Sequence, residues 1–208
     1  KKFRPDIVHV HDIHGYFINE LHFLSYLKSK GIKTVLSLHS DYFYTGRCGV
    51  SGECFKWRSG CGSCPTLKIY PKSLFFDFSS FIFKRKQKLF SNFDSLIITV
   101  PSIWMFQRVI QSPIFHNVGD ISVVPNPLES YWFDSSHHSL LDSNFKFLFK
   151  EKYFLIIASN LMDAHKGGQY TSELSFLCST YNFKFVIVGG GNDIFKNVHN
   201  IINLGKVN

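Results

Sequence analysis

The sequence contains no long apolar segment and few acidic residues. The longest apolar stretch, LFFDFSSFIF at 74–83, is interrupted by Asp77 and by serines. It falls well short of the roughly 20 residues that cross a bilayer as a helix. Only 15 of the 208 residues are Asp or Glu, against 23 Lys or Arg, which gives a formal net charge of +8. This excess predicts an anionic partner: a nucleic acid, a membrane surface or a phosphorylated small molecule.

Signal-peptide patterns, internal repeats and low-complexity tracts are also missing. The first residues, KKFRPDIVHVHD, pass directly into a predicted strand, which favours a cytoplasmic, reducing setting. In that setting clustered cysteines are more often metal ligands or free thiols than disulfides. Apolar and aromatic residues are abundant instead: 45% of the chain is hydrophobic and 23 residues are phenylalanine. This composition excludes an intrinsically disordered protein.

Apolar strand patterns alternate with helical patterns along the chain. We expect strands at 6–11, 33–39, 94–102, 121–127, 153–159, 183–191 and near 200–207, and helices at 18–31, 72–91, 103–112 and 169–182. Such alternation is typical of α/β proteins, whose parallel sheets carry helices on both faces. The polar, Ser-rich stretch 129–147 predicts a boundary, so we expect two Rossmann-like units at 1–129 and 130–208.

Most of the unusual polar residues follow directly after a predicted strand. In open α/β sheets, ligands bind at the carboxyl ends of the strands, and two such units are expected to face each other across a cleft. We therefore look for chemistry in five segments: His9–Gly15, His39–Thr45, Pro101–Trp104, Ser159–Gly168 and Gly189–Asn192.

The first of these segments, HVHDIHG, contains three histidines. His9 and His11 are two residues apart on a predicted strand, so they share one face of it. Three interpretations stay open: a strand end with a buried, hydrogen-bonded histidine, a reactive role for His11, and a metal site completed by Asp12 and His14.

A second candidate follows the strand at 153–159 and opens a helix. Lys166, Gly167 and Gly168 would place an ammonium, bare backbone N–H groups and the positive end of the helix dipole together, which is a cradle for phosphate. The spacing is not that of a P-loop, and a turn with a solvated lysine is the alternative. The glycines Gly189–Gly191 end another strand, where either a ligand or a neighbouring backbone can approach closely.

Four cysteines lie within seventeen residues in the segment HSDYFYTGRCGVSGECFKWRSGCGSCP. Cys48, Cys54, Cys61 and Cys64 have the spacing C-x5-C-x6-C-x2-C, and the final C-x2-C is typical of a zinc knuckle. Structural zinc, free thiols and disulfides all stay open. Four cysteine ligands would leave no position for a zinc-bound water, so a zinc ion here would stabilise the loop and not act as the catalyst.

The segment FKRKQKLF at 83–90 places Lys84, Arg85, Lys86 and Lys88 beside phenylalanines. It predicts either a solvated helix face or a contact with anionic lipid head groups. Nucleic acid is not expected as a partner, because basic and aromatic residues do not interleave as in a base-stacking platform.

Together these motifs resemble a known family, the retaining glycosyltransferases of family 4, which have the GT-B fold. The resemblance is to the branch that builds bacterial capsular, colanic-acid-like and other exopolysaccharides. The pieces that match occur in family order: PDIVHVHDIHGYFIN, LSLHSDYFYTGRC, KWRSGCGSCP, PSIW, VVPNPLE, ASNLMDAHKGG, VIVGGG and NLGKV. The histidine-rich strand end followed by the cysteines is the most specific part.

The resemblance implies roles for both units. Residues 1–129 would belong to an acceptor-binding domain, with His11 near the reacting sugar. The acceptor side would also include Asp12, His14, His39, Asp41 and Ser102. Residues 130–208 would belong to a nucleotide-sugar-binding domain, in which Lys166 neutralises the leaving diphosphate. Asn160, Gly167, Gly189, Gly190 and Gly191 would lie near the donor, with Asn160 at the position where many relatives carry an arginine.

The function implied is that of a hexosyltransferase acting with retention and without a catalytic metal. It would move a sugar from a nucleotide sugar to a lipid-linked polysaccharide precursor, at the inner face of the cell membrane. The family's N-terminal Gly-rich loop and its later Glu-x7-Glu segment have no match here, so both units are expected to be incomplete. A non-catalytic, zinc-stapled binding module and an inactive remnant of such an enzyme are the alternatives.

Overall fold

The computed structural model describes residues 4–133, apart from 16, 69 and 74, and residues 152–206, apart from 164–165, 182, 192–194, 196–197 and 199. The chain divides into two compact units, Lys1–Leu128 and Glu129–Asn208. Most of the predicted boundary segment, 134–147, lies outside the described residues. The acceptor-binding and donor-binding roles of the two units stay predictions.

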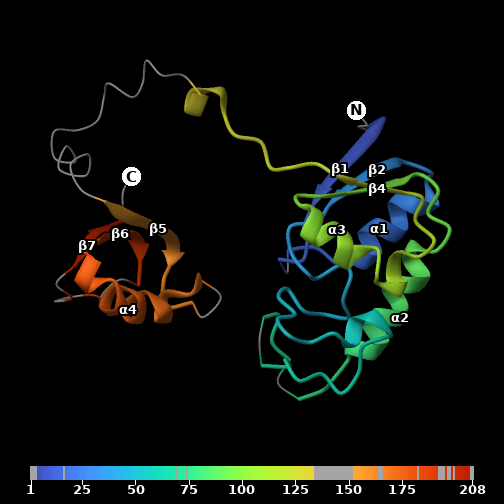
Figure 1. Ribbon diagram of the computed structural model, residues 1–208. Helices are drawn as coiled ribbons and strands as arrows, with labels where there is room; N and C mark the ends of the chain where they lie inside the picture. The colour runs from blue at the N-terminus through green and yellow to red at the C-terminus, as the bar shows by residue number, and fades with distance from the viewer. Residues whose placement is uncertain are drawn as a thin grey trace. The chain divides into compact units, whose positions relative to one another are not determined.

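The first unit is a four-stranded parallel sheet with its crossover helices (Figure 1). Its elements are β1 (Ile7–His11), α1 (Glu20–Ser29), β2 (Lys33–Ser37), α2 (Ser79–Phe90), β3 (Leu96–Val100), α3 (Ile103–Val109) and β4 (Asp120–Val123). The strands lie in the order β1-β2-β3-β4. The expected alternation is confirmed, but the helix predicted at 72–91 begins only at Ser79.

The second unit repeats this architecture on a smaller scale. It contains β5 (Tyr153–Asn160), α4 (Gly168–Leu177), β6 (Lys184–Gly190) and β7 (Ile201–Gly205). The three strands are parallel and lie in the order β5-β6-β7. The helix predicted to reach residue 182 ends at Leu177, and a short 3-10 helix follows at Ser179–Tyr181.

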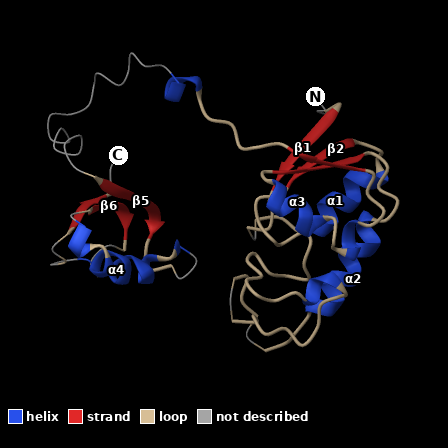
Figure 2. Cartoon of the chain, viewed as in Figure 1, coloured by secondary structure: helices blue, strands red, loops and turns tan. Residues whose placement is uncertain are grey.

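In the described part of each unit, the helices cover one face of the sheet, not both as predicted (Figure 2). The strands follow each other in sequence order, so right-handed crossovers carry every connecting helix to the same side. Burial alternates accordingly: Leu96, Ile98 and Val100 of β3 are buried, whereas Ile97 between them is 42% exposed. On β1, His9 and His11 alternate with the buried Val10, so their side chains point to the uncovered face of the first sheet.

Local sequence explains how α1 is placed against the first sheet. Asn19 caps the helix by accepting a hydrogen bond from the His22 backbone N–H at 2.9 Å, as asparagine does at helix starts. Leu21, Leu24 and Leu27 form the buried stripe.

Within the described residues, every helix is too short or too polar to cross a membrane.

The Cys-rich segment forms a long loop between β2 and α2, and a buried lysine holds it. Lys86 of α2 is fully buried and donates hydrogen bonds to the carbonyls of Tyr42 and Thr45, the latter at 3.1 Å. Its ammonium lies 3.6 Å from the Tyr42 ring centroid. Lys86 therefore does not belong to the solvated or lipid-facing group predicted for Lys84, Arg85, Lys86 and Lys88, because the 3.6-residue helical period turns it inward with Phe83.

Candidate functional site

Three neighbouring strands of the first sheet place polar side chains together at their carboxyl ends. His9 and His11 lie on one face of β1, as predicted, with ring centroids 4.1 Å apart. His9 Nε2 is 2.8 Å from Ser37 Oγ on β2, and Ser37 Oγ is 2.6 Å from Thr99 Oγ1 on β3. The parallel register pairs His11 with Ser37 and Ser37 with Thr99, which aligns the three strand ends.

His11 and His39 form the outer part of this cluster. His11 Nδ1 lies 3.0 Å from His39 Nε2, and the two rings stack with centroids 5.4 Å apart. Desolvation lowers the pKa of His11, the imidazoles of His9 and His39 lower it further, and Asp12 raises it. The lowered pKa favours the neutral form of His11, in which one ring nitrogen can donate and the other can accept a hydrogen bond.

A pocket of about 280 Å³ opens beside these histidines. It is bordered by the ends of β1, β2 and β3 and by the segment that follows β4. Its lining residues are His9, His11, Ser37, Leu38, His39, Thr99, Val100, Pro101, Val124, Pro125, Asn126 and Pro127. Its lining is mostly apolar with a polar cluster on one wall, which is the usual composition of a small-molecule site.

Asp12 and His14 follow β1 in a tight exit turn. Asp12 has a left-handed backbone, with φ of 37°, which is uncommon outside glycine and often accompanies a functional site. His14 Nδ1 lies 3.7 Å from Asp12 Oδ1, and His14 stacks on Tyr42 with centroids 4.8 Å apart. The turn is thus packed against the Cys-rich loop, close to His11 in sequence.

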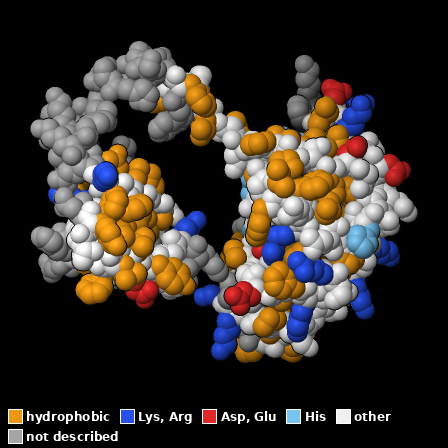
Figure 3. Space-filling view, in the orientation of Figure 1, with side chains coloured by type: hydrophobic (Ala, Val, Ile, Leu, Met, Phe, Trp, Pro, Cys, Tyr) orange, Lys and Arg blue, Asp and Glu red, His pale blue; other side chains and the backbone are white. Residues whose placement is uncertain are grey.

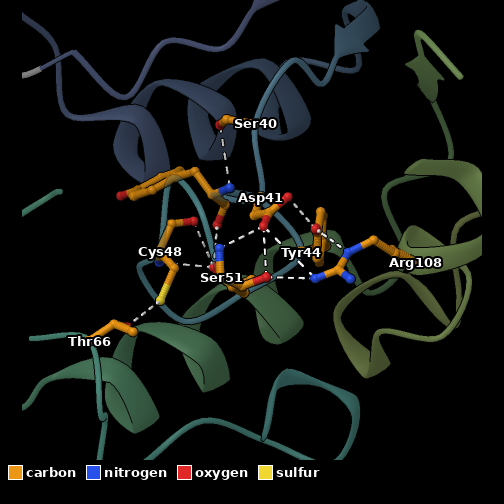
Figure 4. Close-up of polar contacts among 9 residues, drawn as sticks. Ser40, Asp41, Tyr44, Cys48, Ser51, Thr66 and Arg108 are labelled. Atoms are coloured by element: carbon orange, nitrogen blue, oxygen red, sulfur yellow. Dashed lines mark hydrogen bonds and ion pairs between the residues drawn. The ribbon is translucent and has the colours of Figure 1, made fainter. Parts of the chain in front are cut away.

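Asp41, predicted on the acceptor side, is buried in a network that braces the Cys-rich loop (Figure 4). Its Oδ2 accepts hydrogen bonds from the backbone N–H and hydroxyl of Ser51, both at 2.7 Å. The Tyr44 hydroxyl donates to Oδ1, and Arg108 of α3 forms an ion pair at 3.9 Å. Both carboxylate oxygens are engaged, so the geometry gives Asp41 a structural part, and acceptor contact stays a prediction.

Ser102 and Arg108 connect α3 to this region. Ser102 caps α3, accepting a hydrogen bond from the Met105 N–H at 3.2 Å. Arg108 donates to Tyr44 Oη at 2.8 Å and to Ser51 Oγ at 2.6 Å. Its guanidinium lies 4.7 Å from the Trp104 ring centroid and 4.9 Å from that of Trp57. Ser102 therefore has a local role as a cap, and its acceptor role stays a prediction.

In the second unit, the predicted glycines lie where β5 and β6 end side by side. A side chain at Gly189 would overlap the Ala158 carbonyl, and one at Gly191 would overlap Asn160 Oδ1. Gly189 and Gly191 also have positive φ values of 131° and 67°, which favour glycine. Close approach of the β5 backbone therefore explains Gly189, and the positive φ together with the Asn160 side chain explains Gly191. The donor contacts predicted for Gly189–Gly191 stay predictions.

Lys166 and Gly167 precede α4 at the same edge of the second sheet. Gly167, with φ of 70°, caps the helix, and a Cβ on Gly168 would overlap the Leu161 carbonyl. Asn160 Oδ1 accepts a hydrogen bond from the Met162 N–H at 3.0 Å. Lys166 is exposed and lies beside the positive end of a ten-residue helix. This edge offers an anion both an ammonium and backbone N–H groups.

Comparison with known proteins gives a partial match. The chain is 35% identical over 72 residues to a protein of Escherichia coli (strain K12) named "Putative colanic acid biosynthesis glycosyl transferase WcaC". The matched part is 32% of this chain and 18% of that protein. No model of a protein family matches the chain. The chain thus covers less than a fifth of the relative's length, and what it shares with WcaC is local.

The four clustered cysteines border one small pocket of the Cys-rich loop and are all free thiols. The Thr66 hydroxyl lies between two of them, 3.2 Å from Cys48 Sγ and 3.3 Å from Cys64 Sγ. Burial raises the pKa of Cys61 to about 11. Among the described residues, no group of three or more His, Cys, Asp or Glu side chains could hold a metal ion as placed. The cysteines form no disulfide here, and structural zinc at these four positions stays a prediction.

Three residues of the first unit's site, Ser37, Thr99 and Arg108, were not predicted from the sequence. Ser37 and Thr99 are ordinary strand residues whose importance comes from their register beside His9. Arg108 lies within a helix that shows no charge pattern. The available signal was strand position: Ser37 lies two residues, and Thr99 three residues, before a predicted strand end.

Proposed function

We propose that this chain takes part in sugar transfer, carrying a nucleotide-sugar site in its second unit and an acceptor site in its first. The observation that carries this proposal is the 72-residue likeness to a protein named as a glycosyl transferase. The polar strand ends of both sheets support it, because such edges are where α/β proteins bind ligands.

The chemistry proposed for the second unit concerns the leaving group. When the sugar leaves its nucleotide, negative charge develops on the diphosphate, and preorganised cations and amides stabilise it. Lys166 would supply the ammonium, and the first N–H groups of α4 would supply hydrogen bonds. Asn160 and the backbone at Gly189–Gly191 would border the same donor. These groups would serve without a catalytic metal.

The chemistry proposed for the first unit concerns the sugars. A neutral His11 would hydrogen-bond a sugar hydroxyl and orient it for transfer with retention. His39 would fix the tautomer of His11, and Ser37, through His9, would restrain the neighbouring ring. The pocket beside them would take part of a glycan. The acceptor would be lipid-linked, which would bring the protein to the cytoplasmic face of a membrane.

Nucleotide-sugar binding tests the proposal first. In calorimetric titrations with a panel of UDP- and GDP-sugars, the complete protein should bind at least one donor. Lys166→Ala should weaken that binding about 10- to 100-fold, since a charge-assisted contact contributes roughly 1.5–3 kcal/mol. Lys152→Ala, an exposed lysine before β5 in the same unit, is the matched control. Unchanged affinity for Lys166→Ala would remove this lysine from the site.

Turnover tests the first unit separately. His11→Ala should lower the transfer rate while the nucleotide affinity is largely kept, and His22→Ala on α1 should change neither. Full turnover for His11→Ala would make His11 a structural residue. A protein that binds none of the donors would instead favour the alternative, a non-catalytic binding module.

A further inference from the structure

The outer surface of α2 and the segment before it expose an unusual number of aromatic side chains. Phe75 is 87% exposed, Phe76 68%, Phe78 52% and Phe81 58%. Single exposed apolar residues are ordinary, but a contiguous group of them marks an interaction surface. Here the four rings lie within seven residues of one another in sequence.

The exposed face of α2 continues this aromatic group as a row of cations. Phe81, Lys84, Arg85 and Lys88 are exposed at the spacing i, i+3, i+4 and i+7, which is one stripe of a helix. The Arg85 guanidinium lies 5.6 Å from the Phe81 ring centroid, so apolar and charged parts adjoin. The opposite face, Ser79, Phe83, Lys86 and Phe90, is buried.

Two grooves border this stripe, and both are lined by cations. One, of about 660 Å³, is lined by Lys28, Arg85 and Lys88 together with neutral residues of α1 and α2. The other, of about 440 Å³, includes Lys84, Lys88 and His116. None of the described residues that line either groove is acidic. Figure 3 shows basic and hydrophobic side chains side by side on the surface of the first unit.

We propose that this surface, Phe75, Phe76, Phe78, Phe81, Lys84, Arg85 and Lys88, docks on an anionic lipid bilayer. The rings would enter the boundary between head groups and acyl chains, and the cations would meet lipid phosphates, with the two grooves taking head groups. The one acidic residue within the aromatic group, Asp77, accepts hydrogen bonds from the N–H groups of Cys64 and Ser79. The Asp77 carboxylate is therefore engaged by backbone N–H groups.

The order of the side chains favours a bilayer over a nucleic acid. The rings come first and the cations follow, whereas a single strand needs rings and cations interleaved along a groove. The inference deepens the proposed function, since a lipid-linked acceptor would lie in the same bilayer. Only the biological purpose of this docking rests on the proposed function, because vesicle binding is measured without a donor and without sugar transfer.

Co-sedimentation with vesicles tests the proposal. The full chain should bind vesicles of phosphatidylglycerol and phosphatidylcholine in equal parts, bind phosphatidylcholine alone weakly, and lose binding as salt is raised. Replacing Lys84, Arg85 and Lys88 by glutamine should weaken binding roughly 100-fold, about 5-fold for each charge. The control variant carries Arg4→Gln, Lys33→Gln and Lys152→Gln, at three exposed cations outside α2. It has the same charge change and should have little effect.

A second variant tests the aromatic part. Combining Phe75→Ser, Phe76→Ser and Phe78→Ser should weaken vesicle binding yet leave the salt dependence in place. These side chains are exposed, so the change should not unfold the core. The proposal is overturned if the wild-type chain ignores anionic vesicles, or if the control triple variant loses as much binding as the α2 variant. It is also overturned if a single-stranded oligonucleotide displaces the vesicles and depends on the same residues.

Discussion

Replacing Lys86 by methionine is expected to flatten the pH dependence of the first unit's stability. Burial lowers the pKa of Lys86 from 10.5 to about 7, although the Glu20 carboxylate acts in the opposite direction, as do Cys61, Cys48 and Asp12. In the unfolded chain the lysine has its ordinary pKa. Between these two values the unfolded state binds more protons than the folded state, so the free energy of unfolding rises with pH.

The size of the effect follows from the same two values. Each pKa unit corresponds to about 1.4 kcal/mol, so the difference between 10.5 and about 7 amounts to about 5 kcal/mol over the whole window. About 3 kcal/mol of this gain falls between pH 6 and pH 9, according to the linkage relation. Lys86→Met has no proton to release and should lack this gain.

Urea unfolding followed by tryptophan fluorescence measures the gain. In a Trp132→Phe background, the signal comes from Trp57 and Trp104, which both lie in the first unit. Lys88→Met is the matched control, because Lys88 lies exposed on the same helix.

The buried thiols act in the opposite direction. Burial raises the pKa of Cys61 to about 11, so stability falls as unfolded thiols ionise. Below pH 9 the folded Cys61 thiol is protonated with or without Lys86, so this contribution is nearly equal in the two proteins and largely cancels in the difference. Parallel stability profiles for the wild type and Lys86→Met from pH 6 to pH 9 would refute the reasoning.

Three further predictions concern the braced loop and the two strand edges. Arg108→Met should lower the free energy of unfolding by about 3 kcal/mol, because it leaves the buried Asp41 carboxylate without its cation; a loss below about 1 kcal/mol would contradict this. The pKa of His11, lowered by desolvation and then by its histidine neighbours, should rise in an NMR titration of His39→Ala, and a constant value would refute the pairing. Gly189→Ala should prevent the second unit from folding, so an unchanged amide spectrum would exclude the predicted overlap.

The strands were predictable because short local sequence patterns mark where most of them begin and end. Most are short apolar runs bounded on at least one side by Pro, Gly or Asp, and the observed bounds differ from the predicted ones by only a few residues. The start of α2 was not predictable in the same way. Asp77 accepts a hydrogen bond from the Ser79 N–H at 2.9 Å, and this contact begins the helix seven residues later than its apolar pattern suggested.

Which faces the helices cover depends on strand order, which no local pattern contains. The same is true of the site. The histidines at the end of β1 were predictable from their position, whereas the contact between Ser37 and Thr99 arises from the register of β2 with β3. Asp41 followed a predicted strand, yet the fold placed Arg108 against it. Sequence position therefore identified the edge of the sheet but not the partners within it.

The crowding at Gly189 and Gly191 has a consequence for mutational scanning. In a library of all single substitutions, both positions should tolerate almost nothing but glycine, because their positive φ values and the atoms beside them disfavour a side chain with or without a ligand. Depletion of variants there would therefore report on folding. Lys166 is the opposite case: it is exposed, and its side chain costs the fold little to replace. If selection for sugar transfer keeps only lysine or arginine at position 166, the result would show that the ligand bound there is negatively charged.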